Sequence, residues 1–151
     1  MQQARASIAA DDPQDEKATA ESLVLALYRE VWNRGDLEAV SHIVAPEYTI
    51  HSDPGDPWDG MTLNRAEYRR RVEHTRRAFP DIVFTVAETV ATGARVAVRW
   101  SAVGTQTGDL PGLPSTGRRL EFSGQTIYEL ALGQVAGHWQ VVDRLGFIQQ
   151  F

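Results

Sequence analysis

The spacing of apolar residues changes at Pro80, and this change limits the folds that the chain can adopt. Before Pro80, apolar residues recur about every four positions, as at Leu23, Leu27 and Val31, which is typical of amphipathic helices. After Pro80, apolar and polar residues alternate along four long segments, which is typical of strands with one buried face. Helices followed by strands that are joined by short turns predict an α+β domain, in which helices cover one side of a mostly antiparallel sheet.

Capping and turn residues predict where these elements begin and end. The helices expected before Pro80 lie over residues 18–33, 37–44 and 65–79. One short strand is expected over residues 48–52. Asn64 is the expected N-cap of the third helix, and Pro80 ends this helix. Its arginines, among them Arg70 and Arg71, are expected on a solvated outer face rather than at a phosphate or membrane site.

Length and composition fit one globular domain. The chain has 151 residues, of which 42% are apolar and 23% are charged, and this is enough apolar sequence for a core. The first residues are polar and alanine-rich, and no apolar run is long enough for a signal peptide or a membrane span. We therefore expect a flexible tail over residues 1–15, one domain over residues 16–151, and a cytoplasmic protein without membrane association.

Charge and residue content argue against several kinds of partner. The net charge of −5 opposes binding to nucleic acid, because phosphate recognition needs a basic surface. The chain has no cysteine, which excludes disulfides, thiol nucleophiles and zinc–thiolate sites. Its four histidines are scattered, without the spacing of metal ligands. Neither a nucleic acid nor a metal is therefore expected.

Asp143 is the main candidate for acid/base chemistry. It follows Val135, Trp139 and Val141 at even spacing, so in a regular strand its carboxyl would lie on an apolar face. Burial against such a face disfavours the charged form and raises the pKa of a carboxyl toward a range that is useful for proton transfer. A salt bridge to Arg144 or another arginine is the structural alternative, and the strand alternation alone leaves both open.

The other candidates are polar groups near the expected pocket and aromatic residues of its wall. His51, in the strand before a proline-rich loop, could polarise a carbonyl group or carry a proton. Gln125 could stabilise an enolate oxygen, and a glutamine on the sheet surface is an equal alternative. His138 has the opposite alternation to Asp143 and is expected outside the pocket. The aromatic candidates for the wall are Tyr28, Trp32, Trp58, Phe79, Trp100 and Trp139, with Trp58 in a loop that could serve as a lid.

Several short motifs occur in the order found in SnoaL-like polyketide cyclases, and over residues 20–150 the chain resembles this family. The most specific motif is the closing stretch HWQVVDRLG over residues 138–146. The other motifs are Val31-Trp32-Asn33-Arg34-Gly35-Asp36-Leu37, Ala78-Phe79-Pro80-Asp81, Val98-Arg99-Trp100, Gly104-Thr105, Gly112-Leu113-Pro114-Ser115-Thr116-Gly117 and Ile127-Tyr128.

The resemblance implies both a fold and a chemistry. The fold is the cone-shaped α+β fold shared with nuclear transport factor 2, in which a curved sheet wraps around N-terminal helices and encloses an apolar pocket. Founding members close a polyketide ring by intramolecular aldol condensation without a metal or organic cofactor, and their acid/base aspartate falls on Asp143 here. A homodimer formed through the outer sheet face is also implied. Gly137 and Val142 replace a glutamate and an aromatic residue of many relatives, which bears on the substrate more than on the fold.

Residues and resemblance together predict a cofactor-free cyclase or isomerase for a hydrophobic carbonyl substrate. Asp143 would be the acid/base group, while His51 and Gln125 would polarise oxygens. Two alternatives stay open: a hydrolase or hydratase in which Asp143 activates water, and a small-molecule-binding dimer without chemistry. An exposed Asp143, or one held by an arginine, would favour the binding dimer.

Overall fold

The computed structural model describes the backbone of residues 13–151 and the side chains from residue 19 onward. In chain order, the elements are α1 (Pro13–Ala26), η1 (Leu27–Asn33), α2 (Val40–Ile43), β1 (Val44–Ser52), β2 (Thr62–Leu63), α3 (Arg65–Ala78), β3 (Val83–Thr92), β4 (Arg95–Thr105), β5 (Arg119–Ala131), β6 (Gln134–Val142) and α4 (Arg144–Ile148). The expected tail over residues 1–15 lies outside the described residues as far as residue 12, and α1 begins at Pro13. From residue 13 to the end, no helix is long and apolar enough to cross a membrane.

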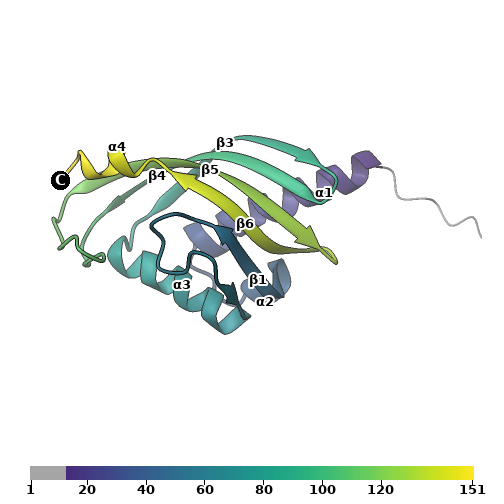
Figure 1. Cartoon of the computed structure of the whole chain (residues 1–151), viewed down its shortest axis with the longest axis horizontal. Helices are drawn as coiled ribbons and strands as arrows, with labels where there is room; N and C mark the ends of the chain where they lie inside the picture. The colour runs from purple at the N-terminus through teal and green to yellow at the C-terminus, as the bar shows by residue number, and fades with distance from the viewer. Residues whose placement is uncertain (1–12) are drawn as a thin grey trace, which may run out of the picture.

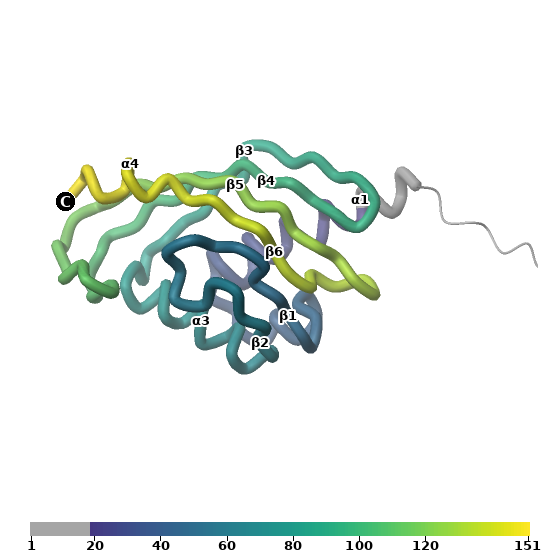
Figure 2. Tube along the Cα trace, viewed as in Figure 1, coloured from purple at the N-terminus to yellow at the C-terminus, as the bar shows by residue number. Residues whose placement is uncertain are grey.

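Six strands form one curved sheet, and α1 and α3 lie on its concave side (Figure 1). The strand order is β2-β1-β6-β5-β4-β3. Neighbouring strands are antiparallel except β1 and β6, which run parallel. The trace in Figure 2 shows α3 and the β1–β2 segment beneath the long strands. The observed fold is therefore the α+β cone that the sequence predicted.

The first helix ends in a π-helical segment, η1, that brings aromatic rings to the sheet. Four of its seven residues are buried, among them Tyr28 and Trp32. The backbone N–H of Arg34 donates to the carbonyl of Arg29, five residues earlier, at 3.2 Å, as π geometry requires. The rings of Tyr28 and Trp32 both pack on Phe84 of β3, at centroid distances of 5.8 and 5.7 Å. This segment therefore supplies one wall of the interior.

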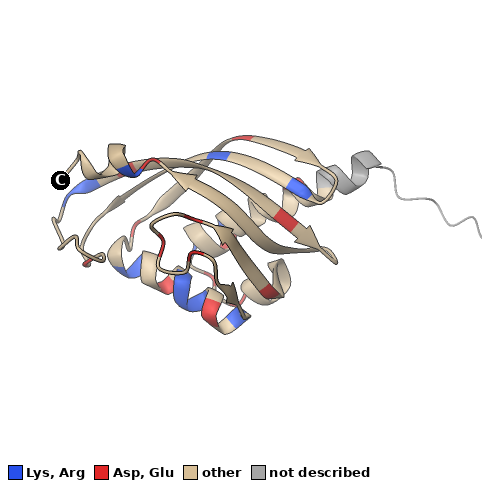
Figure 3. Cartoon of the chain, in the orientation of Figure 1, with Lys and Arg blue, Asp and Glu red and all other residues tan. Residues whose placement is uncertain are grey.

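Helix α3 has the expected start but not the expected distribution of its arginines. Asn64 accepts from the backbone of Glu67 at 2.8 Å, and the Glu67 carboxylate accepts from the Asn64 backbone at 3.3 Å, which is a capping box. Charged residues follow one another along α3 (Figure 3), yet Arg71 is only 7% exposed. It shares the inner helix face with the buried Tyr68 and Val72. The prediction that Arg71 is solvated is wrong, and a buried guanidinium requires anionic partners.

A β-bulge in β6 changes which side chains face the interior. The pairing of β5 with β6 shifts between Glu129 and Leu130, which leaves Ala136 as an extra residue in β6. Val135 and His138 are three residues apart, and both are nevertheless buried. Beyond the bulge, the even-numbered residues of β6 line the interior. A strand that is interpreted as alternating without a break is therefore assigned to the wrong faces beyond the bulge.

Candidate active site

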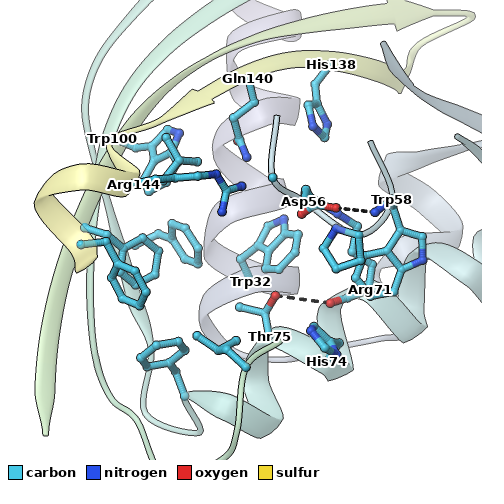
Figure 4. A pocket seen from close by; sticks show the side chains of 18 of the residues that line it. Trp32, Asp56, Trp58, Arg71, His74, Thr75, Trp100, His138, Gln140 and Arg144 are labelled. Carbon is cyan, nitrogen blue, oxygen red and sulfur yellow. Dashed lines mark hydrogen bonds and ion pairs between the residues drawn. The ribbon is translucent and has the colours of Figure 1, made fainter. Parts of the chain in front are cut away.

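A cavity of about 250 Å³ lies between the concave face of the sheet, η1, α3 and α4 (Figure 4). Its wall is mainly aromatic, which suits a flat apolar ligand. The aromatic residues that line it are Tyr28, Trp32, Tyr48, Trp58, Tyr68, Phe79, Phe84, Trp100, Phe122, Tyr128 and Phe147. These rings come from η1, α4, the strands β1, β3, β4 and β5, helix α3 with the residue that ends it, and the loop after β1.

Two loops and α4 line the more exposed part of the cavity. The loop after β1 contributes Trp58, and the loop between β4 and β5 contributes Leu113. The second loop is held by the fully buried Gln106, whose Nε2 donates to the Leu113 carbonyl at 3.3 Å. At the start of α4, Arg144 donates from Nε to the carbonyl of Pro54 at 2.6 Å. This bond ties α4 to the loop after β1.

A buried carboxylate, Asp53, does not itself line the cavity but joins three side chains that do, Arg71, His138 and Gln140. Asp53 follows β1 and is 1% exposed. Its Oδ2 accepts from His138 Nε2 at 3.0 Å, from Gln140 Nε2 at 2.9 Å and from an Arg71 Nη at 3.2 Å. Its Oδ1 accepts no hydrogen bond from the described residues, and a guanidinium nitrogen of Arg144 lies 3.8 Å away. Because buried carboxylate oxygens are normally satisfied, Oδ1 is the atom from which a ligand contact is expected.

Arg71 compensates the charge of this carboxylate. Besides Asp53, it contacts Asp56 Oδ2 at 3.3 Å, and its guanidinium lies over the ring of Trp32 at 5.4 Å. Burial alone would lower the pKa of Arg71, but the surrounding groups, Asp56 first and then Tyr68 and Asp53, together raise the pKa above its ordinary value. Arg71 therefore stays charged. The cluster contains a cation at its centre rather than an isolated buried anion.

His138 is neutral and has one defined tautomer. Burial lowers its pKa below the ordinary value, although the hydrogen bond that His138 donates to Asp53 acts in the opposite direction. A carboxylate only accepts hydrogen bonds, so the ring proton lies on Nε2, toward Asp53. Nδ1 then accepts from the hydroxyl of Tyr48, 2.6 Å away. The buried Tyr48 keeps its own proton, because burial raises its pKa.

The sequence and its relatives assign this fold to a family. The family model of the SnoaL-like polyketide cyclases matches residues 22–151. The chain belongs to this family. Among solved structures, a proposed polyketide cyclase from Acidithiobacillus ferrooxidans is 40% identical, with a TM-score of 0.81 and 96% of each chain covered. A search of curated proteins gave no match.

Two further solved structures with a similar fold carry different proposed activities. IdmH, a proposed polyketide cyclase from Streptomyces antibioticus, is 30% identical; the match covers 87% of this chain and 96% of IdmH, with a TM-score of 0.71. AclR, a proposed hydroxylase from Streptomyces galilaeus, is 25% identical; the match covers 89% of this chain and 96% of AclR, with a TM-score of 0.73. Membership of the SnoaL-like family therefore shows the fold but does not identify one reaction.

Asp143, to which the resemblance assigned the acid/base role, does not line the cavity. It is exposed and caps α4, with the backbone N–H of Gly146 donating to its Oδ1 at 2.9 Å. It borders a second hollow, of about 350 Å³, on the outer side of β3–β5 together with Ser123 and Glu121. The expected position of Asp143 on an apolar pocket face is wrong, because the bulge in β6 reverses the alternation on which that prediction was based.

Three other candidates also lie on the outer side of the sheet. The ring of His51 stacks on Trp139 at 4.1 Å, and its Nε2 is 2.8 Å from Glu129. Arg95 covers Trp139 at 4.4 Å, and Gln125 is exposed. None of these residues lines the cavity, so the predicted positions of His51, Gln125 and Trp139 are wrong. The aromatic candidates that do line it are Tyr28, Trp32, Trp58, Phe79 and Trp100.

The residues that form the polar cluster were missed by the sequence prediction. His138 was expected outside the pocket, yet it is 2% exposed and lines the cavity. The predicted strand ends at residue 52, which leaves Asp53 in the loop that follows. Strand alternation gives no signal for Asp53, because it would place Asp53 on the face of the exposed His51, and the pairing of β1 with β6 shifts between Ile50 and Ser52. Among the side chains that the structure describes, from residue 19 onward, no group of three or more acidic or histidine residues is arranged to hold a metal ion.

Proposed function

We propose that this SnoaL-like protein is an acid/base enzyme of the cyclase or isomerase type, with Asp53 as the proton acceptor in place of Asp143. The observation that carries the proposal is the arrangement around the Asp53 carboxylate. Three donors bind Oδ2 while Oδ1 has no hydrogen-bond partner among the described residues. A carboxylate oxygen without a hydrogen-bond partner, held by side chains that line an apolar cavity, is the kind of base that removal of a proton from carbon needs.

The reaction begins at a carbon next to a carbonyl group of the ligand. Asp53 Oδ1 takes the proton from this carbon, and the electron pair of the C–H bond moves to the carbonyl oxygen to give an enolate. In a cyclisation, the enolate carbon attacks a second carbonyl carbon of the same molecule and forms a C–C bond. The proton on Asp53 then passes to the new alkoxide. Atoms and charge balance without any oxidant or reductant.

The surrounding side chains support this proton transfer in distinct ways. His138 is neutral because burial lowers its pKa, so its Nε2–H stays on Oδ2 throughout and holds the carboxylate in place. Arg144 points into the cavity from the start of α4 (Figure 4), and its side chain is 45% exposed. A guanidinium that can move within the cavity can follow the oxygen of the ligand and stabilise the developing enolate.

The cavity favours a hydrophobic, flat carbonyl compound as the ligand. Its walls present aromatic faces from both the sheet and the helices, for example Trp32 against Phe84 and Phe84 against Trp100, at centroid distances of 5.7 and 5.3 Å. Such walls bind an apolar ring system and limit the access of water to the enolate. This supports a cyclase or isomerase over a site for a small polar metabolite.

The proposal is tested by hydrogen–deuterium exchange at the acidic carbon of 2-tetralone in D₂O, followed by NMR. The wild-type protein should accelerate exchange, and Asp53→Asn should reduce the catalysed rate by at least about a hundredfold. Asp143→Asn is the matched control, because asparagine caps a helix as well as aspartate. It should retain the rate within about twofold. Tryptophan fluorescence with 2-tetralone shows whether the Asp53→Asn cavity still binds.

Two outcomes would overturn this assignment. Loss of exchange in Asp143→Asn, with Asp53→Asn active, would return the acid/base role to the position that the family resemblance implied. Binding of 2-tetralone without any exchange in the wild-type protein would favour a small-molecule-binding module.

The free oxygen of Asp53 also favours a second candidate, a hydratase or hydrolase in the same cavity. Oδ1 could accept from a water molecule that the Arg144 guanidinium, 3.8 Å away, holds in place. An activated water would add oxygen to the ligand rather than exchange its carbon-bound hydrogen. Incorporation of ¹⁸O from labelled water into an aryl epoxide such as styrene oxide distinguishes this candidate from the first.

A further inference from the structure

A buried chain of hydrogen bonds runs from β4 across β5 to the Gln140 amide on β6. Trp100 Nε1 donates to Thr126 Oγ1 at 2.9 Å, and Thr126 Oγ1 donates to Gln140 Oε1 at 2.7 Å. Gln140 Nε2 then donates to Asp53 Oδ2 at 2.9 Å. Trp100 and Thr126 are both buried, at 4% and 1% exposure. Neither contacts Asp53 directly.

The direction of every bond in this chain is fixed by its two ends. An indole N–H can only donate, and a carboxylate can only accept. The Thr126 hydroxyl accepts from Trp100, so its one proton is free to point at the Gln140 carbonyl oxygen. Gln140 therefore presents its NH₂ group, and not its oxygen, to Asp53. Reversing the amide would place two acceptors, Gln140 Oε1 and Asp53 Oδ2, against each other.

We propose that Thr126 and Trp100 are positioning residues for the acid/base step, through the Gln140 amide. Gln140 is only half-buried and points into the cavity (Figure 4), so it has space to rotate away from Asp53. The Thr126 hydroxyl holds it in place and keeps its donor on Oδ2, which leaves Oδ1 as the oxygen that takes the proton. This inference rests on the proposed function of Asp53 and adds the means by which one of the two oxygens is selected.

The pairing of the strands places the residues of this hydrogen-bond chain next to one another. Thr126 pairs directly with Gln140 across β5 and β6, and with Val98 across β4 and β5. Trp100 pairs with Gly124, and the indole lies over that glycine. A Cβ at position 124 would come within 2.5 Å of the Trp100 ring, closer than any real contact. Glycine at this position therefore leaves the space in which the indole N–H reaches Thr126.

The test compares Thr126→Val, which removes the hydroxyl at constant shape, with Thr126→Ser, which keeps it. Thr126→Val should slow 2-tetralone exchange about tenfold, the effect of losing one hydrogen bond in the reacting state, with 2-tetralone affinity unchanged. Thr126→Ser should stay within about threefold of wild type on the same grounds. Thr85→Val is the control, since Thr85 is an exposed threonine on the outer side of β3.

Nuclear magnetic resonance supplies a readout that does not depend on activity. In Thr126→Val, the Gln140 side-chain amide and the Trp100 indole N–H resonances should shift, and the indole proton should exchange faster with solvent. If these resonances do not move, the positioning role is wrong, whatever the exchange rates show. The positioning role is also wrong if these resonances shift but Thr126→Val exchanges 2-tetralone as fast as the wild-type protein, while Asp53→Asn is inactive.

Failure of the proposed function gives a different pattern. Shifted resonances in Thr126→Val, with no exchange by the wild-type protein, would refute acid/base chemistry at Asp53 while the Thr126–Gln140 contact stands. Should Thr126→Val not fold, Trp100→Phe removes the first donor and leaves the Thr126 hydroxyl in place. Trp100→Phe should still shift the Gln140 side-chain amide resonance and slow 2-tetralone exchange. An unchanged amide resonance in that variant overturns the proposal.

Discussion

Two aspartates follow neighbouring parallel strands, yet their environments are opposite. Asp53 comes directly after β1 and Asp143 directly after β6, and these two strands pair in the sheet. Asp53 is 1% exposed and accepts from three side chains, whereas Asp143 is exposed and accepts from the backbone of Gly146. An aspartate at the end of a strand therefore has no fixed chemical role.

The chain that follows each aspartate accounts for the difference. After Asp53, the loop folds back over the strand end: the Asp53 backbone donates to Asp59 at 2.6 Å, and the Asp56 backbone donates to the Asp53 carbonyl at 2.9 Å. After Asp143, the chain turns at once into α4, and the carboxylate caps that helix. A carboxylate that is enclosed by its own loop needs charged partners, and one that caps an exposed helix does not.

Removing either of the two cations near Asp53, one buried and one exposed, should give the largest contrast. Arg71→Leu leaves Asp53 and Asp56 buried without their cation, and we expect a loss of about 3–5 kcal/mol in the free energy of unfolding. Arg144→Leu removes an exposed cation near the same carboxylate and should cost less than about 1 kcal/mol. Urea unfolding at neutral pH measures both. Similar losses for the two variants would mean that the Asp53 cluster is not a buried ion pair.

The next largest contrast is expected between the two faces of the sheet, in how much a substitution by alanine lowers stability. Gly124 faces the cavity side, where a Cβ would lie 2.5 Å from the Trp100 ring and 2.7 Å from the Val141 carbonyl oxygen. Gly124→Ala should therefore destabilise the protein by about 1–3 kcal/mol through overpacking. Ser123→Ala, its exposed neighbour on the outer face, should change stability by less than about 0.5 kcal/mol. Thermal unfolding of the two variants checks this, and an equally stable Gly124→Ala would contradict the close approach.

The fold could be predicted from the sequence because its signals are local and repeated. The change of period at Pro80, the N-cap at Asn64 and the motif order all agree with the observed cone. Each is a property of neighbouring residues, which tertiary contacts reinforced rather than reversed. The ends of elements were predicted less well: the first helix starts at Pro13 and ends in a π-helical segment, which the apolar spacing does not reveal.

The site could be predicted only in part, because its polar residues depend on one irregular pairing. The wall residues Tyr28 and Trp32 lie on a strongly apolar helix, and such residues are buried whatever the details of the sheet. His138 and Asp143 were exchanged between the two faces, because Ala136 interrupts the alternation of β6. Nothing in the residues around Ala136 marks a bulge, since it depends on how β6 pairs with β5.

A third contrast concerns two tryptophans that were both expected to line the pocket. Trp58 lines the cavity, and Trp139 stacks between His51 and Arg95 on the outer face. Trp58→Ala should weaken 2-tetralone binding about tenfold, because apolar contact area with the ligand is lost. Trp139→Ala should leave the dissociation constant within about twofold. Isothermal titration calorimetry measures both, and an equal loss in the two variants would show that the outer face takes part in binding.

The smallest expected effect is the pH dependence of stability that His138 confers. Burial lowers the pKa of His138 in the folded chain, whereas the unfolded chain has the ordinary value near ~6.5. Between these two values the unfolded chain binds more protons, so stability falls as the pH falls below about 6.5, by at most about 1.4 kcal/mol per pH unit. Above that range the contribution of His138 is constant.

Variants of the two histidines on opposite faces separate this effect from the carboxylates, which also titrate at lower pH. His138→Gln should flatten the stability curve between about pH 5 and pH 6.5, although it also lowers stability at every pH by disturbing Asp53 and Tyr48. His51→Gln, at an exposed site on the outer face, should keep the slope of the wild-type protein. Urea unfolding at half-unit pH steps measures the slopes. If His138→Gln keeps the wild-type slope and His51→Gln loses it, the titrating histidine lies on the outer face, and the buried ring of His138 is not the group that resists protonation.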